Sequence, residues 1–309
     1  MGKSLVMSRW VFWAFSIIGL GFGFCRSAEA GELVLVLSSD EPEYLQAAAG
    51  FKSGFSGQFR EINLAGSDAK QRSVGEELKA SPPAGAVVVG DLAGQMAKWY
   101  LAGVPLVYCD VPRAAALAFP SGKYIGIYHE PDPLEQLKSL PELFAGKTRV
   151  GLLYGAGSAQ FNPQELERKA QALGLTLEPV ALGSIQEVPG KLRELLPRIN
   201  LLWVLTDPVI LSERSIQYLV LQSVSAGVPI FCGDLSLARH GATAALVPDW
   251  QDAGRQAAQA AEELLRGSGR PRSALFYPKG KLILNQKIAG MLKVAFPASS
   301  VSLAQERIQ

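Results

Sequence analysis

The sequence predicts an α/β fold of two similar lobes, each containing a parallel sheet with helices packed against it. Short apolar runs alternate with capped amphipathic helices, which is the pattern of a parallel sheet covered by helices. This alternation restarts near the middle of the chain. In addition, two segments of the first half recur in the second half in the same order.

Length and composition agree with this fold and exclude several classes of protein. The 309 residues are 48% hydrophobic and 19% charged, which is enough apolar material for two domains with real cores and too much for a disordered chain. The formal net charge of +2 provides no basic face that could neutralise phosphates. A nucleic-acid partner is therefore not expected.

The first half contains five apolar runs that are expected to form strands, at residues 33–37, 59–64, 86–89, 107–109 and 125–128. Asp40 and Pro42 open the first helix. The apolar face of this helix consists of Tyr44, Ala48, Phe51 and Phe55. A second helix is expected over residues 67–79, and Asp91 is expected to cap a third helix that Gly103 ends.

The second half repeats this alternation. Its expected strands are residues 150–154, 175–180, 201–205, 230–232 and 244–247, with one further strand before a final helix. Asn162 and Pro163 open a helix that Gly174 stops, and Ser212 opens another that ends at Gly227. Weaker and longer helical patterns cover residues 187–196 and 249–267, respectively.

The repeated segments lie at corresponding positions of the two halves. Residues 102–110 match residues 226–234 with five identities in nine, and residues 87–91 match residues 203–207. Part of this match is a glycine and a proline, separated by one residue, before a strand, and this pattern is common in α/β proteins. Two matches in the same order, each at a strand end, nevertheless indicate two similar lobes.

Polar residues directly after the strands are the candidates for a binding site, because helix N-termini and free backbone N–H groups converge at the carboxyl ends of parallel strands. These residues are Ser38, Ser39, Asp40, Glu41, Asp91, Asp110, His129, Glu130, Gly155, Gly157, Ser158, Thr206, Asp207, Gly233, Asp234 and Ser236. The acids among them have an alternative role as helix caps. Both interpretations remain open at this stage.

The sequence does not predict catalysis, a metal site or a cofactor. His129 and His240 are far apart and lack the spacing of metal ligands, and no nucleophile elbow is present. Cys109 and Cys232 have no evident partner base, and cysteine at such strand positions is most often a small buried hydrophobic residue. A disulfide between them is the less favoured alternative.

Several segments of the second half resemble one known family in order and spacing. They are residues 149–158, 204–207, 228–234, 239–242 and 277–279. This set resembles the ABC-transporter substrate-binding proteins of the tryptophan/tyrosine-binding type, over about residues 125–297. The first hundred residues after residue 30 match the family only in architecture. Pro208 stands where the family often has Asn, and the first lobe is shortened.

The resemblance implies a periplasmic-binding-protein fold of type I, in which two Rossmann-like lobes are joined by three crossings of the chain. Lobe 1 would comprise residues 31–130 plus 243–268, and lobe 2 residues 131–242 plus 269–309. Hinge segments are expected at residues 125–129 and near residues 241–244. A small ligand, such as an amino acid, would occupy the cleft between the lobes.

The combined reasoning selects nine ligand-binding residues. They are Ser39, Asp40, Tyr44, Asp91, Gly157, Ser158, Thr206, Asp207 and Asp234. The function expected from the resemblance is that of an exported, monomeric solute-binding protein that delivers its ligand to an ABC permease. The alternative is a periplasmic sensing or interaction module that keeps the two lobes, has changed the site, and acts with a receptor or signalling protein.

The first 30 residues have the pattern of a secretory signal peptide. Lys3 and Arg9 precede an apolar run over residues 10–24, and Ala28-Glu29-Ala30 provides a small-x-small cleavage site. The apolar run of about fifteen residues is shorter than the roughly 20 that a spanning helix needs. An uncleaved anchor and a lipoprotein modified at Cys25 are the alternatives.

We therefore expect cleavage after Ala30, with export as the consequence. N-terminal sequencing of the exported protein should give Gly31 as the first residue. A mature protein that begins at Cys25, or that still contains Trp10, would contradict this prediction.

Overall fold

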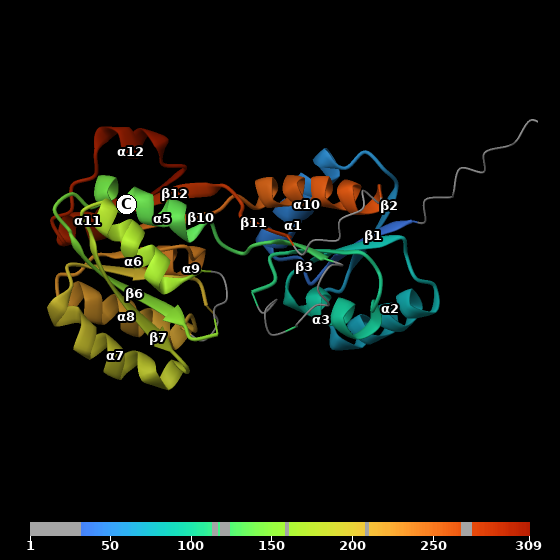
Figure 1. Ribbon diagram of the computed structural model, residues 1–309, viewed down its shortest axis with the longest axis horizontal. Coiled ribbons are helices and arrows are strands. Elements are labelled where there is room, and N and C mark those ends of the chain that lie inside the picture. Colours follow the sequence, from blue (N-terminus) through green and yellow to red (C-terminus); the bar gives the residue numbers. More distant parts are fainter. Residues whose placement is uncertain (1–31, 113–116, 118–123, 158–160, 208–209, 267–273) are drawn as a thin grey trace, which may run out of the picture. The chain divides into compact units, whose positions relative to one another are not determined.

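Two separate sheets organise the chain, and each is covered by helices on both faces (Figure 1). The computed structural model describes residues 32–112, 117, 124–157, 161–207, 210–266 and 274–309. The expected signal peptide lies outside these residues. The α/β fold with two lobes of mostly parallel sheet is confirmed.

The first lobe contains a sheet of six strands in the order β11-β5-β4-β3-β1-β2. Neighbouring strands are parallel throughout. The strands are β1 (Leu33–Leu37), β2 (Phe59–Asn63), β3 (Gly85–Val89), β4 (Leu106–Cys109), β5 (Tyr124–Ile127) and β11 (Ala274–Phe276). The helices are α1 (Pro42–Gly54), α2 (Asp68–Ala80), α3 (Asp91–Tyr100) and α10 (Trp250–Leu265).

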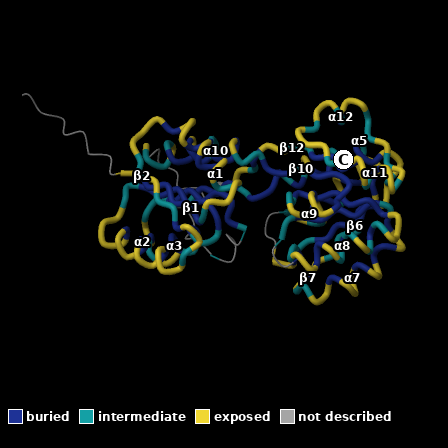
Figure 2. The backbone as a smooth tube through the Cα atoms, turned by 180° about the vertical axis from the view of Figure 1, so that it is seen from behind, coloured by how far each residue is buried: buried dark blue, intermediate teal, exposed yellow. Residues whose placement is uncertain are grey.

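The central strands of this lobe are continuous apolar runs because helices bury both of their faces. In β1, Leu33, Leu35 and Leu37 pack toward α1 and α10. Val34 and Val36 pack toward α2 and α3 on the opposite face. Figure 2 shows the resulting pattern, with buried strands inside and exposed residues on the outer turns of the helices.

The second lobe contains a sheet of seven strands in the order β13-β12-β10-β9-β8-β6-β7. Only the pairing of β10 with β12 is antiparallel among the described strands of this sheet. The strands are β6 (Arg149–Gly155), β7 (Thr176–Leu182), β8 (Leu201–Val204), β9 (Ile230–Cys232), β10 (Ala244–Pro248), β12 (Gly280–Asn285) and β13 (Glu306–Ile308).

Helices again cover both faces of this second sheet. One face packs against α7 (Val188–Leu195), α8 (Glu213–Ser225) and α9 (Leu235–His240). The other packs against α5 (Pro133–Leu143), α6 (Pro163–Ala172) and α12 (Ala298–Leu303). The remaining helical elements are α11 (Gln286–Met291) and the short 3-10 turns Ile185–Glu187 and Leu196–Arg198.

The two lobes have the same strand order, as the repeated segments indicate. Counting strands within each lobe, both sheets contain the order 2-1-3-4-5, with β1, β3 and β4 corresponding to β6, β8 and β9. In the matching segments, Gly103 and Gly227 have positive φ values of 92° and 69° and lie between a helix and the next strand. Gly227 directly follows the C-cap residue of α8, whereas α3 already ends at Tyr100, before the expected stop at Gly103. Cys109 and Cys232 end these corresponding strands, and both are free and buried.

Two expected lobe boundaries differ from the observed sheets. The family pattern assigns residues 243–268 to the first lobe, but β10 pairs with β9 and β12 and therefore belongs to the second sheet. The crossing follows Pro248 rather than residues 241–244. Conversely, β11 extends the first sheet by pairing with β5, so the final crossing lies between Phe276 and Gly280 instead of at residue 269.

Helices α1 and α10 pack closely because glycines stand where they cross. A Cβ atom at Gly254 would overlap the backbone of Ala47, and one at Gly50 would overlap the backbone of Gln251. Backbone cannot move aside as the end of a flexible side chain can. The crossing of these two helices therefore requires glycine.

We expect Gly254→Ala to lower the free energy of unfolding by about 1–3 kcal/mol through overpacking. Gly190→Ala is the matched control, because open space surrounds that position in α7 and alanine is the better helix former. Urea denaturation of both variants provides the measurement. Equal stability of Gly254→Ala and the wild type would show that the two helices are not packed this closely.

Candidate ligand-binding site

The strand order places a switch point in each lobe, between β1 and β3 and between β6 and β8. In open α/β sheets, ligands bind beside the carboxyl ends of the strands at such a point. The selected residues Ser39, Asp40 and Asp91 follow β1 and β3, while Gly157, Thr206 and Asp207 follow β6 and β8. Ser158 lies outside the described residues.

In the first lobe, Ser38 fixes the switch point. Its Oγ donates to the carbonyl oxygen of Val89 at 2.8 Å and accepts from the backbone N–H of Ala93 at 3.0 Å. It thereby joins the end of β1 to the start of α3. Gly90 has a φ of 85°, and a Cβ atom there would lie 2.6 Å from both Ser38 Oγ and Tyr44 Cζ. The Tyr44 ring therefore lies against the Gly90 backbone.

Asp40 and Asp91 do not cap helices. The N-cap residue of α1 is Glu41, which makes no side-chain capping bond, and that of α3 is Gly90. Asp40 instead accepts a hydrogen bond from Asn63 Nδ2 at 2.7 Å. The sequence interpretation of Asp91 as the cap of its helix is wrong, because the helix begins at Asp91 itself.

Asp234, in contrast, has the capping role that the sequence left open. Its Oδ1 accepts from the backbone N–H of Leu237 at 2.6 Å, at the start of α9. Burial raises the pKa of this carboxyl, and the backbone hydrogen bonds at the helix start partly oppose the shift. Asp207 is half-buried, and its carboxylate occupies the space that a Cβ atom at Gly155 would need.

The first crossing holds the loop that precedes Asp207. Glu130 Oε2 accepts from the backbone N–H of Thr206 at 3.1 Å, and His129 Nε2 lies 3.1 Å from the Thr206 carbonyl oxygen. Because a carbonyl oxygen only accepts, His129 is the donor. Sequence analysis places both residues at the end of a strand but does not select them for the site.

Glu130 belongs to a buried polar network. Gln136 Nε2 donates to the carbonyl oxygen of Pro131 at 2.9 Å and to Glu130 Oε2 at 3.4 Å. The side-chain oxygen of Gln136 in turn accepts a hydrogen bond from Trp203 Nε1 at 3.0 Å. Glu130 Oε1 is buried and has no hydrogen-bond partner among the residues that the structure describes. A Cβ atom at Gly233 would lie 2.9 Å from Glu130 Oε2, so the network also needs that glycine.

Burial shifts the pKa values of both crossing residues toward their neutral forms. It raises the pKa of Glu130 to about 7, although the hydrogen bonds from Thr206 and Gln136 lower it. It also lowers the pKa of His129, against the opposing effect of the Thr206 carbonyl. The rings of Tyr128 and Tyr277 stack with centroids 5.0 Å apart, which joins the first crossing to the last.

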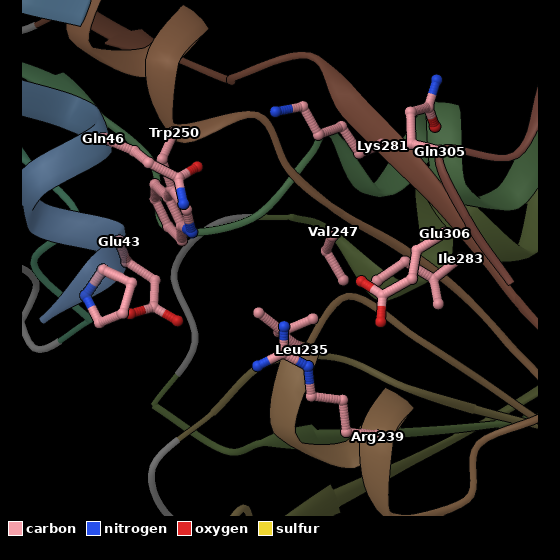
Figure 3. A pocket seen from close by; sticks show the side chains of 11 residues that line it. Glu43, Gln46, Leu235, Arg239, Val247, Trp250, Lys281, Ile283, Gln305 and Glu306 are labelled. Carbon is pink, nitrogen blue, oxygen red and sulfur yellow. The ribbon is translucent and has the colours of Figure 1, made fainter. Parts of the chain in front are cut away.

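A pocket of about 450 Å³ lies beside the second crossing (Figure 3). Its lining includes Glu43 of α1, Arg239 of α9, Trp250 of α10 and Lys281 of β12. None of the nine selected residues lines it. Lys281 forms an ion pair with Asp249 at 3.1 Å. The pocket therefore combines charges of both signs with the aromatic ring of Trp250.

The described residues contain no group of three or more His, Cys, Asp or Glu side chains that could hold a metal ion. Within the same residues, no helix is long and apolar enough to cross a membrane. Burial raises the pKa of the Cys109 and Cys232 thiols well above the usual value, which keeps both protonated and unreactive.

Comparisons with known proteins agree with this fold. The family model for ABC transporter substrate binding proteins matches residues 117–308. A structure from Streptococcus pneumonia, described as an ABC domain in complex with L-Trp, is 19% identical with a TM-score of 0.64, covering 90% of this chain and 99% of that chain. No curated protein sequence gives a significant match.

Two further solved structures have the same fold. A conserved domain protein from Vibrio cholerae is 16% identical with a TM-score of 0.62, covering 90% of this chain and 100% of that chain. A ligand-free, open substrate-binding protein with adhesive properties from Clostridium difficile is 14% identical with a TM-score of 0.66, with the same coverages. At these identities the likeness extends to the fold alone.

We expect Glu130→Gln to stabilise the protein more at pH 8 than at pH 5. The folded state raises the pKa of Glu130 from 4.5 to about 7, so it favours the protonated carboxyl. This preference contributes to the free energy of unfolding of the wild type. The contribution is fully present below pH 4.5 and is lost as the pH rises through 7. The change amounts to about 3 kcal/mol at most. The opposite contribution of His129 is common to both proteins and cancels.

Urea denaturation of the wild type and Glu130→Gln at the two pH values measures this difference. Glu76→Gln, at an exposed position of α2, is the control and should change stability equally at both values. A difference between Glu130→Gln and the wild type that is the same at pH 5 and pH 8 would contradict the prediction.

Proposed function

The chain belongs to the family of ABC transporter substrate-binding proteins, and on this premise we propose that it is an exported protein that captures a small solute between its lobes for an ABC permease. Substrate-binding proteins of this family are exported and are not a class of enzymes. We propose that this chain is periplasmic once residues 1–30 are removed, and that it binds its ligand without transforming it.

The doubled strand order is the observation that carries this proposal. Both lobes have a 2-1-3-4-5 order, and in both, polar residues follow the two strands that flank the switch point. The chain passes between the sheets at three places, after Ile127, Pro248 and Phe276. Lobes joined by short crossings can rotate about them, and such closure sequesters a ligand between two sets of strand ends.

We propose that the second lobe holds the polar or cationic part of the ligand with Asp207 and Asp234. Ser39, Asp40 and Tyr44 would meet it from the first lobe, together with Asp91 and Thr206. A ligand carboxylate would be held by N–H groups near Gly157 and Ser158. An amino acid is the ligand class we favour, since the structural relative from Streptococcus pneumonia is a complex with L-Trp.

Asparagine substitutions test the two acids of the second lobe. A charge-assisted hydrogen bond to an ammonium contributes about 1.5–3 kcal/mol, so Asp207→Asn and Asp234→Asn should each weaken binding by roughly 10- to 150-fold. Folding should persist, because asparagine is as good an N-cap as aspartate at the start of α9.

A thermal-shift screen of amino acids and small organic ions first identifies a ligand of the mature protein, and calorimetry then measures the affinity of each variant. Asp68→Asn, an exposed acid in the first turn of α2, is the control and should bind like the wild type. Unchanged affinity in both test variants would assign these acids to structural roles. That result would favour the alternative function, a sensing or interaction module. Pro208, which stands where the family often has Asn, also favours this alternative.

A further inference from the structure

A second pocket lies entirely within the second lobe, where α7 and α8 run side by side (Figure 1). It has a volume of about 580 Å³ and is lined by the 3-10 turn before α7, the start of α7 and the N-terminal part of α8. Pockets that hold small molecules have volumes of about 300–1,000 Å³. None of the nine selected residues lines this pocket, so a ligand here goes beyond the proposed function.

The helices on both sides of this pocket are fixed by the same core. Val188, at the start of α7, is 2% exposed and belongs to one buried cluster with Ile216 and Leu219 of α8. Tyr218 is half-buried and packs against this cluster. Because the shared core holds both helices in place, the pocket is already formed in the protein without a ligand.

Half of the residues that line the pocket are apolar. Ile185, Val188, Pro189 and Leu221 contribute aliphatic side chains, and Tyr218 contributes an aromatic ring. Leu221 is 61% exposed. A single exposed leucine is ordinary on a protein surface, but this one lines a concave surface together with other apolar side chains. A ligand that covers these side chains removes apolar surface from water, which favours binding.

The polar side chains of the lining divide into two groups. Ser212 and Ser215 form the capping box of α8, in which each backbone N–H donates to the hydroxyl oxygen of the other serine, at 2.9 and 3.2 Å. These two hydroxyls therefore serve the fold. Gln186, Gln217 and Arg214, in contrast, make no hydrogen bond or ion pair with any residue that the structure describes. Their donors are available to a ligand.

Arg214 is the one charged residue among the described residues that line this pocket. It stands in the first turn of α8, where the helix dipole disfavours a positive charge, so the helix does not explain it. Glu187, in the turn before α7, accepts a hydrogen bond from the backbone N–H of Gly183 at 3.3 Å. Neither Glu187 nor Glu213 lines the pocket. The lining thus combines one positive charge with an apolar surface.

We infer that this pocket binds a soluble apolar monoanion, a carboxylate carried on an aliphatic or aromatic body. The planar guanidinium of Arg214 matches the two oxygens of a carboxylate. The apolar side chains cover the body of the ligand, as in other small-molecule pockets. A single positive charge favours a monoanion over a polyanion. A zwitterionic amino acid is disfavoured, because the lining has no acid for its ammonium group.

Three probes of equal chain length separate the charge from the apolar body. They are octanoate, octanol and octylammonium, each titrated into the mature protein by calorimetry. We expect octanoate to bind roughly 3- to 10-fold more tightly than octanol, because octanoate alone pairs with Arg214 at a partly exposed position. Octylammonium should bind most weakly, because its charge has the same sign as the guanidinium.

Two substitutions at exposed positions of α8 test the two parts of the pocket. Arg214→Gln should weaken octanoate binding by roughly 3- to 10-fold and leave octanol binding unchanged. Leu221→Ala should weaken the binding of both by a similar factor, because it removes apolar contact surface. Arg72→Gln in α2 and Leu303→Ala in α12 are the matched controls, since both residues are exposed and lie outside the pocket. Both should bind octanoate like the wild type.

Several results would overturn this inference. They are the absence of octanoate binding, equal affinity for octanoate and octylammonium, and octanoate affinity that neither Arg214→Gln nor Leu221→Ala changes. Octanoate affinity that falls in Asp207→Asn but not in Arg214→Gln would also overturn it, because the probe would then occupy the strand ends. All four results leave the proposed function standing. Conversely, octanoate binding that depends on Arg214 and Leu221 supports the inference even if no solute of the thermal-shift screen binds.

Discussion

The first crossing holds both the backbone N–H and the carbonyl oxygen of Thr206, and the geometry of the candidate site in the second lobe depends on these two contacts. Glu130 accepts the Thr206 N–H, and His129 donates to its carbonyl oxygen. Both side chains come from the segment directly after β5, a strand of the first sheet. These hydrogen bonds tie the first crossing directly to the loop that carries Asp207.

The burial of Glu130 at this crossing lowers the stability of the folded protein. A carboxyl at 0% exposure loses its solvation, and one of its oxygens has no partner among the described residues. Gln136, itself oriented by Trp203, offsets part of this loss. Folded proteins retain such incomplete polar networks mainly where function constrains the chain. Its position at a crossing agrees with a role in the relative movement of the lobes.

The acids of the two lobes differ in how far the fold occupies them. In the second lobe, Asp234 caps α9, so part of its hydrogen-bonding capacity serves the helix. In the first lobe, the carboxylate of Asp110 is buried and makes no hydrogen bond or ion pair with the residues that the structure describes. Two acids at corresponding strand ends of the two lobes therefore differ in their surroundings, because the fold gives Asp234 a hydrogen-bond donor and gives Asp110 none among the described residues.

Much of the architecture could be predicted from the sequence because its determinants are local. A strand buried on both faces is apolar at every position, as in β1, and helix starts have recognisable residues, such as Asn162 before α6. The repeated segments around Gly103 and Gly227 also indicated the equivalence of the lobes before any strand order was known.

Other features were decided only by the tertiary structure. The sequence of β10 gives no indication of which sheet it joins, because its partners β9 and β12 are distant in the chain. Whether an acid after a strand caps a helix, as Asp234 does, or stays unpaired, as Asp110 does, depends on neighbours contributed by other elements. Periodicity and caps are properties of adjacent residues, whereas strand pairing, burial and electrostatic environment arise only when distant segments meet.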